Sequence, residues 1–240
     1  MLKKFLGSPI ATVALFVAAA ALIGYGGIKG VQAAPRVQSE LFGVQVELDH
    51  IQTSLTENGQ IAEGDGDLLG QRFFDANDDL SDASQFKVGK AYNEVLAVQN
   101  TGTIDQYVRV TVRKYWYEEE QGADGVAKKR VNLDPSLINL HFVTDDGWVI
   151  DEKASTPERT VLYYQGIVGS EQDSESGEPS STSPFVDKIT ISSDVLTQTT
   201  DKNLDYENLR FCVEAEVDAV QTHNGDEAMR GVWGRTVEGY

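Results

Sequence analysis

Cysteine and histidine are both scarce in this chain of 240 residues, which contains one cysteine and three histidines. A single cysteine excludes an internal disulfide framework and a zinc site built from several cysteines. The histidines, His50, His141 and His223, form no His-Glu-x-x-His motif, and no Gly-x-Ser-x-Gly nucleophile elbow occurs. The sequence therefore predicts no catalytic residue, and we expect a protein that is not an enzyme.

Basic residues are also in short supply, because 20 Lys and Arg stand against 38 Asp and Glu, a net charge of −18. Nucleic-acid binding requires clustered cations that displace phosphate counterions, so it is excluded. Adhesion to an anionic membrane by a basic face is excluded for the same reason. The length corresponds to one domain, large enough to enclose a hydrophobic core.

The one long apolar run lies at the N-terminus. Lys3 and Lys4 precede 24 uncharged residues, 5–28, and small residues follow before Pro35. A basic start, an apolar stretch and a small-residue exit are typical of a secretory signal peptide, so residues 1–34 are predicted to be a leader that is cleaved near Ala33 or Ala34. The run is also long enough to span a bilayer, and a retained membrane anchor is the alternative.

Removal of this leader leaves a strongly acidic protein, residues 35–240. From Pro35 on, 17 bases stand against 38 acids, a net charge of −21. Such a surface is well solvated and is repelled by an anionic cell envelope. We therefore expect the mature protein to be extracellular, with contact to a membrane only through its leader.

Alternation of apolar and polar residues over several stretches predicts β-strands. In the clearest, residues 104–117, Val108, Val110, Val112 and Trp116 share one face. In residues 209–221 the inward residues are expected to be Phe211, Val213, Ala215, Val217 and Ala219. We expect residues 92–99 to form a hairpin with 104–117. Asp146-Gly147, between the strand-like residues 140–143 and 148–150, predicts a turn. Residues 226–233 look helical, and residues 134–137 form a second candidate helical turn.

Seven or more strands with almost no βα alternation predict an all-β fold, an antiparallel β-sandwich with one or two short helices. Two segments, 59–82 and 170–184, are rich in acidic, glycine, serine or proline residues. We expect them to be surface loops inserted in a single domain.

Clustered oxygen donors in the first loop suit a hard cation such as calcium. The motif Asp75-x-Asn77-x-Asp79 begins like an EF-hand loop, but Leu80 and Phe86 stand where the glycine and the bidentate glutamate are needed. We expect weak calcium binding at most; a solvated acidic loop is the alternative. The candidate ligands are Asp65, Asp67, Asp75, Asn77 and Asp79. Cys212 is expected on the same strand face as Glu214 and Glu216, which makes it a poor nucleophile.

Six motifs are spread over the mature chain, at residues 100–105, 107–110, 114–116, 133–138, 158–164 and 217–224. Together they resemble a family of exported surface proteins of Gram-positive bacteria, related to TasA and camelysin. The long apolar leader is similar to the alternate signal peptides that a dedicated (SipW-type) signal peptidase cleaves. The resemblance implies a jelly-roll sandwich and a cell-surface or biofilm-matrix protein that assembles into fibres.

The sequence is compatible with three functions. The first is a structural surface protein whose partners are itself or sister surface proteins. The second is a monomeric binding module for carbohydrate or protein, because Tyr107, Tyr115 and Tyr117 are expected on one face with Arg109 and Arg113. The third is a metal-dependent secreted hydrolase.

For the first function, the mature N-terminus is the predicted assembly segment. Its apolar positions Val44, Val46 and Leu48 alternate with polar ones and would add as a strand to the edge of a neighbouring sandwich. The alternative is that this segment is the first strand of its own domain.

Overall fold

The computed structural model describes residues 50–62, 71–78, 80, 86–119, 127–170, 180–201, 206 and 210–237. The leader with Ala33 and Ala34, and the segment with Val44, Val46 and Leu48, lie outside this part of the chain. Within the described residues, no helix is both long enough and apolar enough to cross a membrane.

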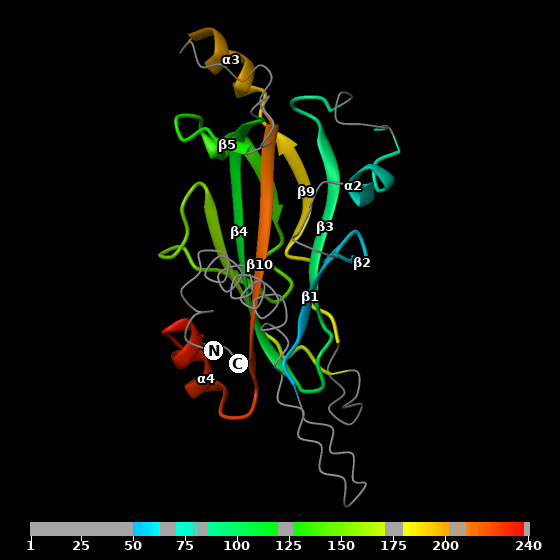
Figure 1. Ribbon diagram of the computed structural model, residues 1–240, viewed down its shortest axis with the longest axis vertical. Coiled ribbons are helices and arrows are strands. Elements are labelled where there is room, and N and C mark those ends of the chain that lie inside the picture. The colour runs from blue at the N-terminus through cyan, green and yellow to red at the C-terminus, as the bar shows by residue number, and fades with distance from the viewer. Residues whose placement is uncertain are drawn as a thin grey trace, which may run out of the picture. The chain divides into compact units, whose positions relative to one another are not determined.

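The described strands form two antiparallel sheets (Figure 1). The first sheet has the order β2 (Gln60–Ile61), β1 (Thr53–Glu57), β3 (Ala91–Asn100), β9 (Val186–Ile191) and β6 (Ile138–Phe142). The second has the order β10 (Arg210–Gln221), β4 (Gln106–Glu119), β8 (Arg159–Tyr164) and β7 (Trp148–Ile150), and β5 (Ala127–Lys129) pairs with the end of β4.

Successive strands pass repeatedly between the two sheets. The chain leaves β3 in the first sheet for β4 in the second, returns to β6, crosses to β7 and β8, returns to β9 and crosses again to β10. The pairing is nested, because β3 pairs with β9 and β4 pairs with β8, as in a long hairpin that has been rolled up. This wrapping is typical of a jelly roll. The predicted all-β antiparallel sandwich is confirmed.

Helices are few and short in the described part of the chain. They are α2 (Gln71–Asp75), α3 (Asp194–Asp201), α4 (Gly225–Trp233) and the 3₁₀ helix η3 (Pro135–Leu137). The helix and the helical turn expected near the C-terminus and at 134–137 are both present. The Asp134 side chain caps η3 by accepting a hydrogen bond from the N–H of Ser136 at 2.9 Å. Helices α2 and α3 were not expected from the sequence.

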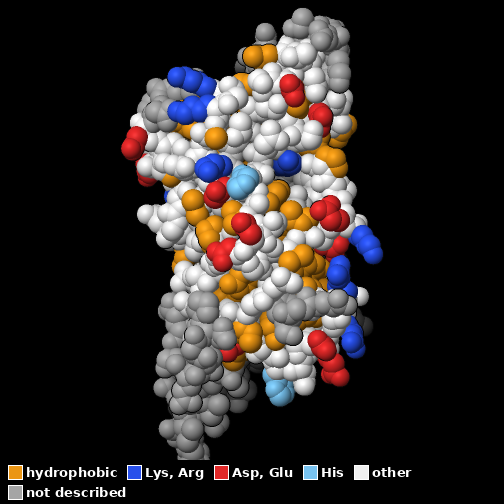
Figure 2. Space-filling model, turned by 180° about the vertical axis from the view of Figure 1, so that it is seen from behind, with side chains coloured by type: hydrophobic (Ala, Val, Ile, Leu, Met, Phe, Trp, Pro, Cys, Tyr) orange, Lys and Arg blue, Asp and Glu red, His pale blue; other side chains and the backbone are white. Residues whose placement is uncertain are grey.

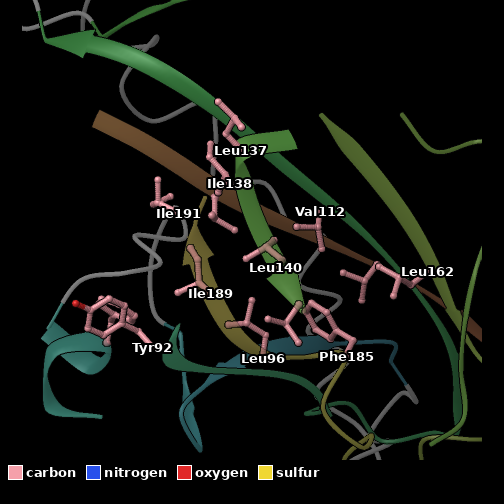
Figure 3. Close-up of a cluster of buried hydrophobic side chains, with 14 of the residues drawn as sticks. Tyr92, Leu96, Val112, Leu137, Ile138, Leu140, Leu162, Phe185, Ile189 and Ile191 are labelled. Carbon is pink, nitrogen blue, oxygen red and sulfur yellow. The ribbon is translucent and has the colours of Figure 1, made fainter. Parts of the chain in front are cut away.

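The core lies between the inner faces of the two sheets. The residues of β4 predicted to point inward are at most 5% exposed: Val108, Val110, Val112 and Trp116. The predicted inward residues of β10 belong to the same core or pack against it: Phe211, Val213, Ala215, Val217 and Ala219. Figure 3 shows Leu96, Leu140 and Ile189 of the first sheet facing Val112 and Leu162 of the second. Burial of each such side chain contributes about 1.5–3 kcal/mol.

The predicted hairpin of residues 92–99 with 104–117 is wrong, although both strands are present. β3 and β4 lie in different sheets, and so do β6 and β7. The links between them cross from sheet to sheet. The Asp-Gly signal does mark a turn, because Gly147 has a φ of +86°, but this turn connects the two layers. Alternation identifies a strand and its inward face, whereas the choice of partner depends on contacts far along the chain.

The crossing from β3 to β4 is held by a buried polar cluster. The Asn100 side chain donates to the carbonyls of Ile104 at 2.8 Å and Val168 at 2.9 Å, and its oxygen accepts from the Gly102 N–H. The Gln106 amide also donates to this oxygen, at 2.8 Å. These side-chain bonds provide hydrogen-bond partners for main-chain groups at the link between the two sheets.

The segment 59–82, predicted as a surface loop, is partly buried. It contains β2 and α2, and Phe73 and Leu80 are 2% and 4% exposed. The Phe73 ring contacts Phe86 and Tyr92, with centroids 6.2 and 6.1 Å apart. Its many polar residues therefore do not keep this segment at the surface, because its few aromatic residues pack into the core.

The end of the second predicted loop is also part of the fold. Thr182 is buried, its N–H donates to the Val98 carbonyl at 2.8 Å, and its hydroxyl accepts from the Val98 N–H. Residues 180–184 therefore extend along β3 into β9. Residues 171–179 lie outside the described part.

Candidate functional site

The predicted calcium ligands are only partly within the described structure. Asp65, Asp67 and Asp79 lie outside it. Asp75 ends α2 and is exposed, whereas Asn77 is only 6% exposed. The structure therefore places the two described candidates in different surroundings, one at the surface and one in the interior.

The side-chain amide of Asn77 forms hydrogen bonds with main-chain groups of both α2 and β3. Its Nδ2 donates to the carbonyls of Phe73 at 2.8 Å and Asn93 at 2.9 Å. Its Oδ1 accepts from the Asn93 N–H at 2.8 Å. Asn77 thus fastens α2 to β3, a structural role that accounts for its burial.

The other side chains considered for chemistry lie on outer faces. Cys212 lies on the outer face of β10 beside Glu214, as predicted, with its Sγ 3.9 Å from Glu214 Oε1. His141 Nδ1 lies 2.6 Å from Asp187 Oδ1 on exposed surface. Seen from behind, the molecule shows charged side chains of both signs interspersed with apolar ones (Figure 2). Among the residues described, no group of three or more His, Cys, Asp or Glu side chains is placed to hold a metal.

A buried pair of carboxyl groups was not foreseen from the sequence. Glu57 of β1 and Glu94 of β3 both have no exposed surface. Asn58 Nδ2 donates to Glu94 Oε2 at 3.4 Å, and Arg72 Nη1 lies 3.7 Å from Glu57 Oε2. Burial, reinforced by the charge of Glu57, raises the pKa of Glu94 to about 8. In so acidic a chain, no local signal distinguished these two glutamates from the others.

One long sheet edge is formed by β10. Among the described strands it pairs only with β4, in an unbroken register from Arg210 opposite Tyr117 to Gln221 opposite Gln106. An edge strand of this length presents main-chain donors and acceptors that invite a further strand. Its outer face carries Glu214, Glu216 and Asp218, and charged side chains of this kind discourage uncontrolled pairing.

The outer face of the second sheet carries an arginine-lined pocket of about 420 Å³. Strand register determines its base: Arg109 lies between Asp218 and Tyr163, Thr111 between Glu216 and Val161, and Arg113 opposite Arg159. Asp151, Ala154, Trp233 and Arg235 line the rest. Four arginines therefore surround one cavity together with three carboxylates, in a protein whose net charge is −18.

Helix α4 closes one side of this pocket. Its residues Met229 and Trp233 pack with Val161, Tyr163 and Val220 in a second hydrophobic cluster. The helix comes very close to the sheet at Gly225, where a Cβ atom would lie 2.5 Å from the Tyr107 ring. It ends at Trp233, and the C-cap residue Gly234, with a φ of +71°, turns the chain toward the pocket residue Arg235.

Two of the pocket arginines are held firmly by carboxylates. Arg109 donates through Nε at 3.0 Å and Nη2 at 2.7 Å to Asp218 Oδ2. Burial alone would lower the pKa of Arg109, but hydrogen bonds to Asp218 and Tyr163 raise it. Arg235 pairs with the Asp151 side chain, which is 8% exposed. These pairs order the wall of the pocket.

The other two arginines are less well compensated. Arg113 Nη1 lies 3.2 Å from Glu216 Oε2, an exposed pair. The Arg159 guanidinium donates to one main-chain oxygen, that of Ala154, through Nε at 3.2 Å and Nη2 at 2.7 Å. Like charges directly opposite each other on neighbouring strands repel, so the Arg113–Arg159 pair leaves excess positive charge at this end of the pocket.

The three tyrosines considered for sugar stacking do share this outer face with Arg109 and Arg113, but they form no open platform. Tyr107 lies against α4. Tyr115 donates to Glu214 Oε1 at 2.5 Å, and Lys129 Nζ lies 5.1 Å from its ring centroid. The pocket, which no sequence pattern indicated, is the better candidate for binding.

Comparison of the chain with protein-family models, with curated proteins and with solved structures finds no match.

Proposed function

We propose that this chain is an exported cell-surface or matrix structural protein that associates with itself, or with sister surface proteins, by strand addition. The leader-like N-terminus and the charge of −21 after Pro35 support export. A dedicated signal peptidase would release the mature protein. Without its leader, the mature protein would no longer contact the membrane. The family resemblance in the mature chain supports the same role.

The observation that carries this proposal is the edge of β10. Across the described strands it is paired along one side only, over twelve residues. A strand added there gains main-chain hydrogen bonds along its length. The donor we propose is the mature N-terminal segment of a neighbouring copy, with Val44, Val46 and Leu48 buried against that neighbour.

A contact of this kind joins two different surfaces of the same molecule. Such a head-to-tail interface does not close on itself unless the rotation between copies permits a ring, so it extends into filaments. Removal of the leader frees the donor segment, and assembly would therefore follow export.

The test compares the mature chain, beginning at Pro35, with a truncated chain that begins at Asp49. Two point variants provide a matched pair within the donor segment: Val46→Ser changes an apolar position, and Gln45→Ser changes its polar neighbour. We expect filaments from the mature chain and from Gln45→Ser. The truncated chain and Val46→Ser should stay monomeric, as measured by sedimentation and electron microscopy.

Filaments formed by a folded truncated chain would show that this segment is not the connector. A mature chain that remains monomeric at every concentration would favour the monomeric binding module. Circular dichroism of each variant separates loss of assembly from loss of folding. N-terminal sequencing of protein recovered from the cell surface checks the cleavage at Ala33 or Ala34.

A further inference from the structure

The arginine-lined pocket points to a binding function that is independent of strand addition. Its volume, about 420 Å³, lies within the range of small-molecule sites. Its lining is mainly charged and polar, so it suits a polar ligand. The surrounding protein is strongly acidic, and an anion is therefore attracted only where arginines are concentrated.

Arg113 and Arg159 mark the position of the anion within the pocket. They lie directly opposite each other on β4 and β8, and among the described residues the Arg159 guanidinium donates only to the carbonyl of Ala154. A guanidinium group presents a planar fork of donors that matches the two oxygens of a carboxylate or a phosphate. An oxyanion between the two arginines would replace their mutual repulsion with two attractive contacts.

The opposite end of the pocket is suited to hold the rest of a ligand. Trp233 lines it and is 8% exposed, and its buried Nε1–H has no acceptor among the described residues. The Arg109 guanidinium lies 5.7 Å from the Trp233 ring centroid. The rest of a ligand would therefore lie against Arg109 and Trp233.

We propose that this pocket binds a small polar ligand through a carboxylate or phosphate oxyanion held between Arg113 and Arg159. The flanking pairs Arg109–Asp218 and Arg235–Asp151 hold the walls in place. The same oxyanion chemistry is carried by an acidic sugar and by inorganic phosphate, so both serve as probes.

The experiment measures binding of galacturonate, inorganic phosphate and glucose to the mature chain by calorimetry. Glucose is the neutral control for galacturonate. Arg159→Gln removes the less compensated arginine, and Arg130→Gln removes an equal charge from a pair with Glu118 outside the pocket. Arg113→Gln is a second pocket variant in case Arg159→Gln does not fold.

We expect at least one of the two anions to bind, and Arg159→Gln or Arg113→Gln to weaken it about tenfold or more. Arg130→Gln should leave the affinity within about twofold. Binding of galacturonate alone identifies a carboxylate-bearing ligand, and binding of phosphate alone identifies a phosphate-bearing one. The proposal is overturned if neither anion binds at millimolar concentration, if glucose binds as well as galacturonate, or if Arg130→Gln weakens binding as much as the pocket variants.

Discussion

Glu94 of β3 and Glu57 of β1 lie together in the interior of the sandwich, each with no exposed surface. Burial and the neighbouring Glu57 raise the pKa of Glu94 from an ordinary value of 4.5 to about 8. Glu94 therefore keeps its proton at neutral pH in the folded state. Arg72 is the positively charged residue beside this pair of carboxyl groups, and its Nη1 lies 3.7 Å from Glu57 Oε2.

Stability should consequently fall as the pH rises through this range. The unfolded chain releases the Glu94 proton near pH 4.5, whereas the folded chain keeps it up to about pH 8. The folded state binds more protons in between, so its free energy of unfolding decreases by about 1.4 kcal/mol per pH unit from this group. In Glu94→Gln this contribution is absent, and in the exposed control Glu216→Gln it remains. Urea denaturation between pH 5 and pH 9 measures both; equal pH slopes for wild type and Glu94→Gln would contradict the assignment.

A substitution at Asn77 distinguishes a structural role of this residue from a calcium-binding role. Asn77→Asp replaces a donor to two main-chain carbonyls with a carboxylate oxygen, and we expect a loss of about 3 kcal/mol or more. If Asn77 were a calcium ligand, the added charge would instead strengthen the calcium-dependent rise in melting temperature.

Thermal unfolding of wild type and Asn77→Asp in millimolar calcium and in millimolar magnesium separates the two roles. We expect Asn77→Asp to melt lower in both, with no greater response to calcium than wild type. Asp75→Asn is the control at the exposed candidate. A larger calcium response in Asn77→Asp would show that residue 77 does bind the ion.

Two glycines of α4 provide a matched pair for the docking of this helix. A Cβ at Gly225 would lie 2.5 Å from Tyr107 Cε2, whereas one at Gly231 meets nothing within 4 Å. Gly225→Ala should therefore destabilise the protein by about 1–3 kcal/mol through the clash. Gly231→Ala should stabilise it by about 0.5–1 kcal/mol, because alanine favours the helix. Chemical denaturation measures both changes, and a neutral Gly225→Ala would mean that α4 is not held against Tyr107.

Assembly by strand addition should depend on salt. With a charge of −21 per mature subunit, neighbouring copies repel each other, and salt screens this repulsion over a Debye length of about 8 Å at physiological ionic strength. We expect filament formation to become faster as sodium chloride rises, and also as the pH falls and carboxylates are neutralised. Light scattering follows the rate; assembly that slows with added salt would indicate an interface held by ion pairs instead.

The alternating side chains of β4 and β10 determined by themselves which residues face the core. Each strand has a side-chain period of two, so the inward set is a local property. The same alternation was sufficient to predict a β-sandwich, and the helix at the C-terminus was also predicted from the sequence. Burial of Phe73 and Leu80 could not be read in this way, because their segment has too few apolar residues to show a period.

Only the tertiary structure decided which strands pair and which charged groups meet. Arg109 contacts Asp218 across 109 positions of sequence, and no local pattern distinguishes that partner from other carboxylates in an acidic chain. Arg113 and Arg159 likewise become neighbours only because β8 follows β4 in the sheet. Glu57 and Glu94 acquire their shared burial from the pairing of β1 with β3. Local residue patterns specify strands and faces, whereas the sites depend on the long-range packing of those faces.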